Sequence, residues 1–126
     1  MSHDVVADAL NMIKNAKKAG KETIKINRIS NPLIEILKIM KQKGAILRYK
    51  IDRDKKIVQL TIGELFDCKA IKPRFTVKKE VVDKYRRRYL PSRKMGTLII
   101  STNKGLMTHE EAENEKTGGC LIAYFY

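Results

Sequence analysis

Residues 97–112 read TLIISTNKGLMTHEEA, an apolar segment followed by a polar loop and the start of a helix. Thr97 to Ile100 predicts a buried strand, because apolar and β-branched residues follow one another without a charged residue. Thr108 and Glu111 form a capping box, in which a Thr caps a helix and a Glu three residues later reaches back to it. The stretch therefore predicts a strand, a loop and a short helix in close succession.

The polar loop consists of Ser101, Thr102 and Asn103, followed by Lys104 and Gly105. Small hydroxyl and amide side chains can bond phosphate oxygens, ribose hydroxyls and base edges, and a lysine adds a phosphate contact. The glycine permits a close approach of the backbone to a ligand. The same residues also suit an ordinary hairpin turn, since Asn and Gly favour tight turns. Both interpretations stay open on composition alone.

The rest of the C-terminal half is predicted to be rich in strands. Apolar and basic residues alternate over 71–78, so a strand there would have one apolar and one positive face. Residues 81–89 predict a short helical turn, in which Tyr85 and Tyr89 either stack on bases or enter the core. Gly118 and Gly119 turn the chain into a last apolar strand at residues 121–126.

Two amphipathic helices and three short strands are predicted in the first half of the chain. Apolar residues keep helical spacing over residues 4–19, and again from a cap at Ser30 or Asn31 to a stop at Gly44. The predicted strands are residues 24–26, 47–51 and 58–62, of which the last two form a hairpin. The order is α-β-α-β-β, with the helices covering one face of a small sheet.

The expected fold class is therefore α+β. An N-terminal α-β-α-β-β domain, residues 1–65, packs against a mainly β C-terminal domain, residues 66–126, that contains one short helix. We place the boundary there because the pattern loosens around residues 63–69. A chain of 126 residues suits one domain or two small ones.

Basic residues are concentrated in parts of the chain. Lys and Arg number 27 against 14 Asp and Glu, which gives a net charge of +13. Between Lys69 and Lys94 the chain has eleven basic and two acidic residues. Such segregation indicates a basic surface for a polyanionic partner, although a merely soluble lysine-rich face stays an alternative. The candidate phosphate contacts in this stretch are Lys72, Arg74, Arg86, Arg87, Arg88 and Arg93.

Several other classes of protein are excluded or disfavoured. No apolar run approaches the ~20 residues of a membrane span, and the N-terminus does not resemble a signal peptide, so no membrane partner is expected. Cys68 and Cys120 are expected to be reduced thiols, and no metal-ligand spacing or cofactor motif is present. His109 beside Glu110, or with Cys120, lacks a third group and a substrate pocket, so no enzymatic activity is expected.

The chain resembles a known family. Residues 100–112, with Gly118, Gly119 and the apolar aromatic terminus, resemble the signature of the universal small-subunit ribosomal protein numbered eight. The resemblance extends over essentially the whole chain, through residues 7–16, 30–31, 70–75 and 89–93. Residues 71–75 and 109–112 look like the archaeal and eukaryotic branch.

The resemblance implies a structural constituent of the small ribosomal subunit in the cytoplasm. Members bind a stem in the central domain of small-subunit ribosomal RNA directly, organise assembly of the platform, and lie beside other small-subunit ribosomal proteins. Some also bind their own messenger RNA and repress translation. Two alternative functions remain. The stronger is a freestanding RNA-binding translational regulator with the same fold, and the weaker is a DNA-binding module.

The resemblance also assigns residues to the RNA. The loop matching Ser101 to Gly105 carries the main contacts, and Gly118 and Gly119 match a second turn beside it. Ser30 and Asn31 match N-terminal positions near a second piece of RNA, where the family often has Lys in place of the Asn. Cys120 stands where bacterial members have a Glu that reaches RNA, so that role is not transferred.

Overall fold

Helix α1 (Val5–Lys18) begins after Asp4, whose side chain accepts a hydrogen bond from the backbone N–H of Ala7 at 3.1 Å. In the computed structural model, which describes residues 4–72, 74–92 and 95–126, the chain forms two compact units, Met1–Lys69 and Ala70–Tyr126. The domain limits predicted above, residues 1–65 and 66–126, stay a prediction about folding units.

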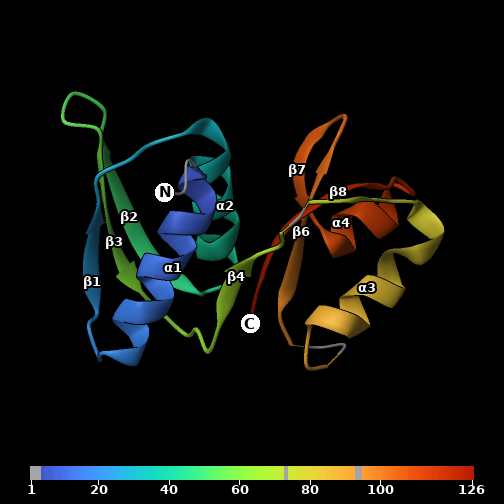
Figure 1. Cartoon of the computed structure of the whole chain (residues 1–126), viewed down its shortest axis with the longest axis horizontal. Helices are drawn as coiled ribbons and strands as arrows, with labels where there is room; N and C mark the ends of the chain where they lie inside the picture. Colours follow the sequence, from blue (N-terminus) through green and yellow to red (C-terminus); the bar gives the residue numbers. More distant parts are fainter. Residues whose placement is uncertain (1–3, 73, 93–94) are drawn as a thin grey trace. The chain divides into compact units, whose positions relative to one another are not determined.

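The N-terminal unit has the predicted order α-β-α-β-β. Helix α2 (Asn31–Gln42) begins after Ser30, whose hydroxyl accepts from the N–H of Leu33 at 3.2 Å, so Ser30 rather than Asn31 is the cap. The strands form an antiparallel sheet in the order β1-β3-β2, namely β1 (Thr23–Ile26), β2 (Ile46–Asp52) and β3 (Ile57–Ile62). Both helices lie on one face of this sheet (Figure 1).

Alternation along these strands separates a buried face from an exposed one. Ile26, Val58 and Leu60 are buried, whereas Lys25 and Gln59, their neighbours in the chain, are exposed. Because successive side chains of a strand point to opposite faces, the apolar set packs against the helices and the polar set faces away from them.

The C-terminal unit combines a five-stranded sheet with helices. The strand order is β4-β8-β6-β7, and β5 pairs with β8. The elements are β4 (Cys68–Ala70), which spans the limit between the two units along the chain, and then β5 (Thr76–Val77), the 3₁₀ turn η1 (Lys79–Val81), α3 (Val82–Tyr89), β6 (Thr97–Thr102), β7 (Gly105–Thr108), α4 (His109–Asn114) and β8 (Gly119–Phe125). The molecule is thus of the α+β class, as predicted, with the buried strand at Thr97 and the last strand near the predicted positions.

Helix α3 lies within the predicted residues 81–89 but is a regular α-helix of eight residues and not a single turn, so the described part of the C-terminal unit has two α-helices where one was predicted. Val82 and Arg86 form its buried face, and Tyr85 and Tyr89 are half-buried beside the core. The ring centroids of Tyr85 and Phe75 lie 5.1 Å apart, and Tyr89 stacks on another ring of the core. The two tyrosines therefore serve packing, which was one of the two interpretations left open. An arginine on the buried face hid the helical period.

Both cysteines are free thiols. Burial, followed by the negative charge of Asp67, raises the pKa of Cys68 to about 12, and its Sγ donates to the carbonyl of Leu10 at 3.3 Å. Cys68 is therefore a protonated, packed side chain at neutral pH. Within the described ranges, no helix has both the length and the apolar character that a bilayer crossing requires.

Candidate RNA-binding surface

The predicted polar loop is the tip of the β6–β7 hairpin. Thr102 pairs with Gly105, and Asn103 and Lys104 form the turn between them. The Thr102 hydroxyl accepts from the N–H of Lys104 at 3.1 Å and donates to the carbonyl of Gly105 at 3.0 Å. Gly105 has a φ of +107°, which side chains other than glycine rarely adopt. Thr102 thus holds the tip in shape, while its neighbours face outward.

Asn103, Lys104 and Gly105 are exposed, whereas Ser101 and Thr102 are half-buried. The Lys104 ammonium lies 4.0 Å from Glu115, and both side chains are more than 40% exposed. Such an exposed pair contributes about 1 kcal/mol or less, so Lys104 can exchange Glu115 for a phosphate. The tip therefore offers one amide, one cation and a strand-end hydroxyl on a fixed backbone.

The predicted second turn lies beside this hairpin. Ser101 pairs with Cys120, and Gly119 pairs with Val77 on the other side. A Cβ on Gly119 would collide with the Ser101 carbonyl oxygen and would lie 2.9 Å from the Ile100 Cγ2. A Cβ on Gly118 would collide in the same way with the Val77 carbonyl oxygen. The two glycines allow three segments to approach one another at the root of the loop.

Lys72 and Arg74 lie on a segment that runs along β8. The N–H of Ile71 donates to the carbonyl of Ile122, and the N–H of Leu121 donates to the carbonyl of Phe75, each at 2.9 Å. Lys72 and Arg74 are exposed. The structure therefore brings the ends of the basic segment, the glycine turn and the hairpin beside β8, which periodicity alone did not show.

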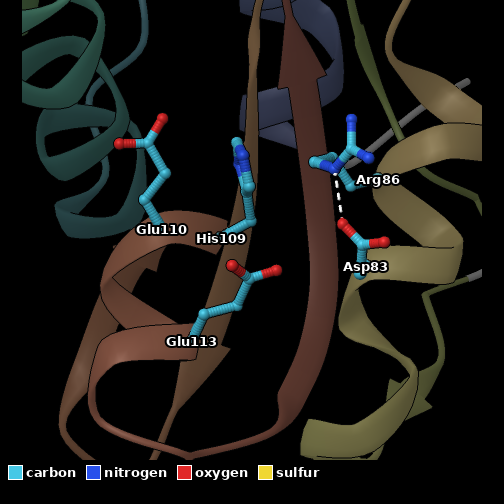
Figure 2. A pocket seen from close by; sticks show the side chains of 5 residues that line it. All are labelled: Asp83, Arg86, His109, Glu110 and Glu113. Carbon is cyan, nitrogen blue, oxygen red and sulfur yellow. Dashed lines mark hydrogen bonds and ion pairs between the residues drawn. The ribbon is translucent and has the colours of Figure 1, made fainter. Parts of the chain in front are cut away.

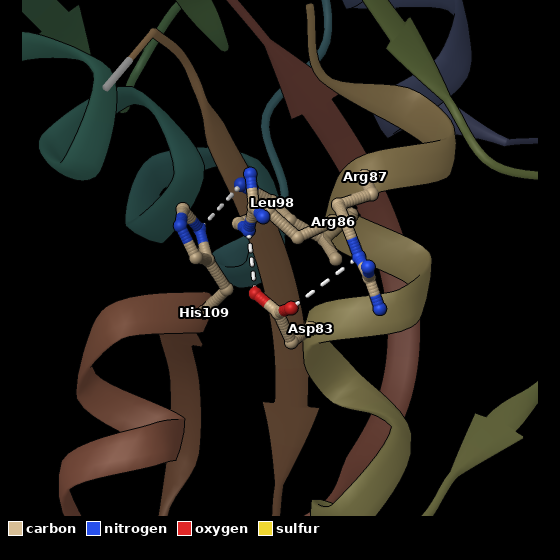
Figure 3. Close-up of polar contacts among 5 residues, drawn as sticks. All are labelled: Asp83, Arg86, Arg87, Leu98 and His109. Carbon is tan, nitrogen blue, oxygen red and sulfur yellow. Dashed lines mark hydrogen bonds and ion pairs between the residues drawn. The ribbon is translucent and has the colours of Figure 1, made fainter. Parts of the chain in front are cut away.

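The three consecutive arginines of α3 have different environments. The Arg86 side chain is only 5% exposed, and its Nε donates to Asp83 at 2.8 Å (Figure 3). Arg87 is 68% exposed, with its Nε 3.4 Å from the same carboxylate, and Arg88 is exposed. Arg86 was predicted to contact phosphate. It lies instead on the buried face of α3, where its guanidinium is paired with the partly exposed carboxylate of Asp83, and so it is not available to a phosphate.

Replacing Arg87 and Arg88 together with Glu is expected to leave the fold intact and to weaken ribosomal RNA binding about fivefold or more in low salt. The loss should shrink as salt rises, because exposed charges are screened. Arg86→Glu alone should instead destabilise the unit by about 3 kcal/mol or more, since it places an unpaired carboxylate at a buried position beside the partly exposed carboxylate of Asp83. Thermal unfolding and filter binding at two salt concentrations separate these effects, and a loss that persists in high salt contradicts the electrostatic interpretation.

Arg87 and Arg88 lie away from the hairpin tip. Helix α3 ends at Tyr89, close in sequence to the start of β6 at Thr97, which is the end of that strand opposite the tip (Figure 1). The six residues of β6 span about 20 Å. The arginines of α3 and the tip of the loop therefore suit different stretches of RNA.

His109 and the glutamates of α4 have structural roles. Nδ1 of His109 accepts from the N–H of Leu98 at 3.1 Å, which ties the start of α4 to β6 (Figure 3). Thr108 accepts from the N–H of Glu111 at 3.1 Å, which confirms the predicted capping box.

A shallow hollow between α3 and α4 is lined by Asp83, Arg86, His109, Glu110 and Glu113 (Figure 2). Its arginine and histidine are both engaged with the protein itself, Arg86 with Asp83 and His109 with β6. In the part of the chain that the structure describes, no group of three His, Cys, Asp or Glu residues is placed to hold a metal ion.

Ser30 and Asn31 lie in the N-terminal unit. The Ser30 hydroxyl serves the cap of α2, and Asn31 is exposed. With Ile29, Arg53 and Lys56 they line a small hollow. The two cations were not among the predicted site residues, because their placement depends on how the β2–β3 turn approaches α2. Arg93, another predicted contact, lies outside the described residues.

Comparisons with known proteins agree with the residue-level resemblance. Residues 4–126 match the family described as Ribosomal protein S8. The small ribosomal subunit protein uS8 of Nanoarchaeum equitans (strain Kin4-M) is 42% identical over 129 residues, which cover all of this chain and all of that protein. This chain belongs to the ribosomal protein S8 family. As a member, it is a structural constituent of the small ribosomal subunit and not an enzyme, and it is similar to an archaeal relative, as the resemblance implied.

Proposed function

We propose that this ribosomal protein S8 family member binds directly to a stem in the central domain of small-subunit ribosomal RNA, and that this binding organises assembly of the platform. The β6–β7 hairpin would insert its tip into the RNA, with Ser101, Asn103 and Lys104 as the contacting side chains. The observation that carries the proposal is the Thr102 hydroxyl, whose two hydrogen bonds fix a tip with an exposed amide and cation.

The physics of RNA recognition supports this role for a short, rigid, polar loop. The major groove of A-form RNA is too deep and narrow for side chains, so proteins contact the shallow minor groove, 2′-hydroxyls and distorted or unpaired bases. A loop held before binding loses less conformational entropy than a mobile one. Gly118 and Gly119 would contribute backbone groups beside the tip, which they hold in place because their missing side chains let neighbouring segments approach.

Cations around the tip would supply most of the affinity. Lys72 and Arg74 lie between two residues that bond to β8, Ile71 and Phe75, and Arg87 and Arg88 would meet RNA farther away. If about six cations contact phosphates, affinity should fall about a thousandfold between low and moderate salt. Ser30 and Asn31 would contribute to a second RNA contact, and Arg93 stays a predicted one.

Co-sedimentation with ribosomal particles tests the proposal against a freestanding translational regulator. We expect the protein to sediment with small subunits in the cytoplasmic extract and to protect the central-domain stem from nucleases. A protein that stays at the top of the gradient while binding a messenger RNA would contradict the proposal. Binding of its own messenger RNA stays a prediction from the resemblance.

The stem prepared as DNA of equal sequence tests the remaining rival. We expect at least about tenfold weaker binding, because the 2′-hydroxyls and the A-form groove are lost. Equal affinity for both would favour a general polyanion-binding or DNA-binding module.

A further inference from the structure

A second basic surface lies on the N-terminal unit, on the face of its sheet that α1 and α2 leave uncovered (Figure 1). Strand register places its side chains in rows across β1, β3 and β2. Lys25 pairs with Gln59, and Gln59 pairs with Lys50 on its other side. In the next row Thr61 stands between Thr23 and Arg48. We call these six residues the outer sheet surface.

Among the described residues, the cations of the outer sheet surface outnumber the carboxylates near them, although Asp52 at the end of β2 lines the same hollow as Lys25 and Lys50. Lys25, Arg48 and Lys50 are exposed, and none of them forms an ion pair within the part of the chain that the structure describes. The nearby Asp52 accepts the backbone N–H groups of Asp54 and Lys55 at 3.1 and 3.2 Å, so it shapes the β2–β3 turn. The six residues of the surface thus include three cations and no carboxylate, and Asp52 lies beside them with its Oδ1 bonded to the backbone of the β2–β3 turn.

The surface is slightly hollowed at one end. The hollow is lined by Lys25, Lys50, Asp52, Lys55, Ile57 and Gln59. Neighbouring strands lie about 4.8 Å apart, so the stems of Lys25 and Lys50 begin about 10 Å from each other on a rigid support. The amide of Gln59 lies between them and can donate to a phosphate or a ribose hydroxyl.

We infer that the outer sheet surface binds the sugar–phosphate backbone of a second segment of ribosomal RNA, separate from the stem that meets the hairpin tip. The inference rests on the proposed function, since it takes ribosomal RNA as the polyanion. Lysine is depleted at protein–protein interfaces, which rely on aromatic and other apolar anchors. The rows have lysine, arginine, threonine and glutamine, the residue types that position proteins on a nucleic-acid backbone.

Lys25→Gln with Lys50→Gln tests the inference in the full-length chain. Affinity for complete small-subunit ribosomal RNA should fall about tenfold in low salt. The slope of the logarithm of the binding constant against the logarithm of the salt concentration should become shallower by about 1.5 to 2, which is slightly less than one for each lost phosphate contact. Affinity for the isolated central-domain stem should change less than about twofold, because phosphate contacts elsewhere are untouched.

Lys18→Gln with Lys38→Gln is the matched control, since both lysines are exposed on the helices and the same charge is removed. An equal loss from this control would overturn the inference, because total charge alone would then explain the result. Unchanged affinity for bare ribosomal RNA, with lost incorporation only when other ribosomal proteins are present, would also overturn it, in favour of an acidic protein partner. Failure of the wild-type protein to bind the stem would instead contradict the proposed function.

Discussion

Gly119→Ala is expected to lower the midpoint of thermal unfolding of the C-terminal unit by about 10 to 20 °C. The added Cβ would collide with the Ser101 carbonyl oxygen and press on the Ile100 Cγ2, both in β6. Because β6 and β8 are paired at this point, the Ser101 carbonyl cannot move away without separating the strands. Overpacking of this kind costs about 3 kcal/mol. The displaced strand carries the hairpin, so stem affinity should also fall about tenfold or more.

Gly105→Ala is the control for this substitution. Gly105 also has an unusual backbone conformation, but nothing lies within 4 Å of the Cβ that alanine would add. Its cost is therefore only the backbone strain of about 1 kcal/mol, and the unfolding midpoint should fall by about a third as much. Equal shifts for the two variants, measured by circular dichroism, would contradict close approach as the reason for Gly119.

The N-terminal elements were predictable because their signals are local. Each signal needs only neighbouring residues: the helical spacing of apolar residues within 4–19, the Ser-Asn-Pro start of a helix at Ser30, and the alternation of apolar and polar residues in the strands. Helix α3 was underestimated for the opposite reason. Arg86 occupies its buried face, where its charge is paired with the carboxylate of Asp83. A charged residue at a core position breaks the apolar period that sequence reasoning depends on.

The hairpin loop was located from sequence, but the roles within it were not. Thr102 was predicted as an RNA contact, and its hydroxyl already has two hydrogen-bond partners in the turn. The contact between Gly119 and Ser101 joins residues far apart in sequence, so no local pattern contains it. The outer sheet surface needed the strand order as well, because Lys25 and Lys50 share a row only when β3 lies between β1 and β2.

Thr102→Ala with Asn103→Ala is expected to weaken binding of the central-domain stem by more than about tenfold while the fold stays intact. Asn103 would lose its direct hydrogen bonds to the RNA. Thr102 would lose the two bonds that hold the turn, so the tip would have to be ordered on binding. Both residues lie at the end of the hairpin, away from the buried core, and the unfolding midpoint should change by only a few degrees.

Single substitutions separate the two roles. Thr102→Ser keeps the hydroxyl and should retain nearly wild-type affinity for the stem. Thr102→Val keeps the shape of the side chain but should lower the affinity several-fold, mainly because the RNA dissociates faster from a less ordered loop. Asn103→Asp keeps the size of the side chain but places a negative charge near the phosphates. Its loss of affinity for the stem should therefore exceed that of Asn103→Ala and should be larger in low salt. Titration of the stem with each variant measures these differences. If Thr102→Ser and Thr102→Val bind alike, the turn hydrogen bonds do not matter for recognition, and if the double alanine variant binds like wild type, the RNA does not meet this hairpin.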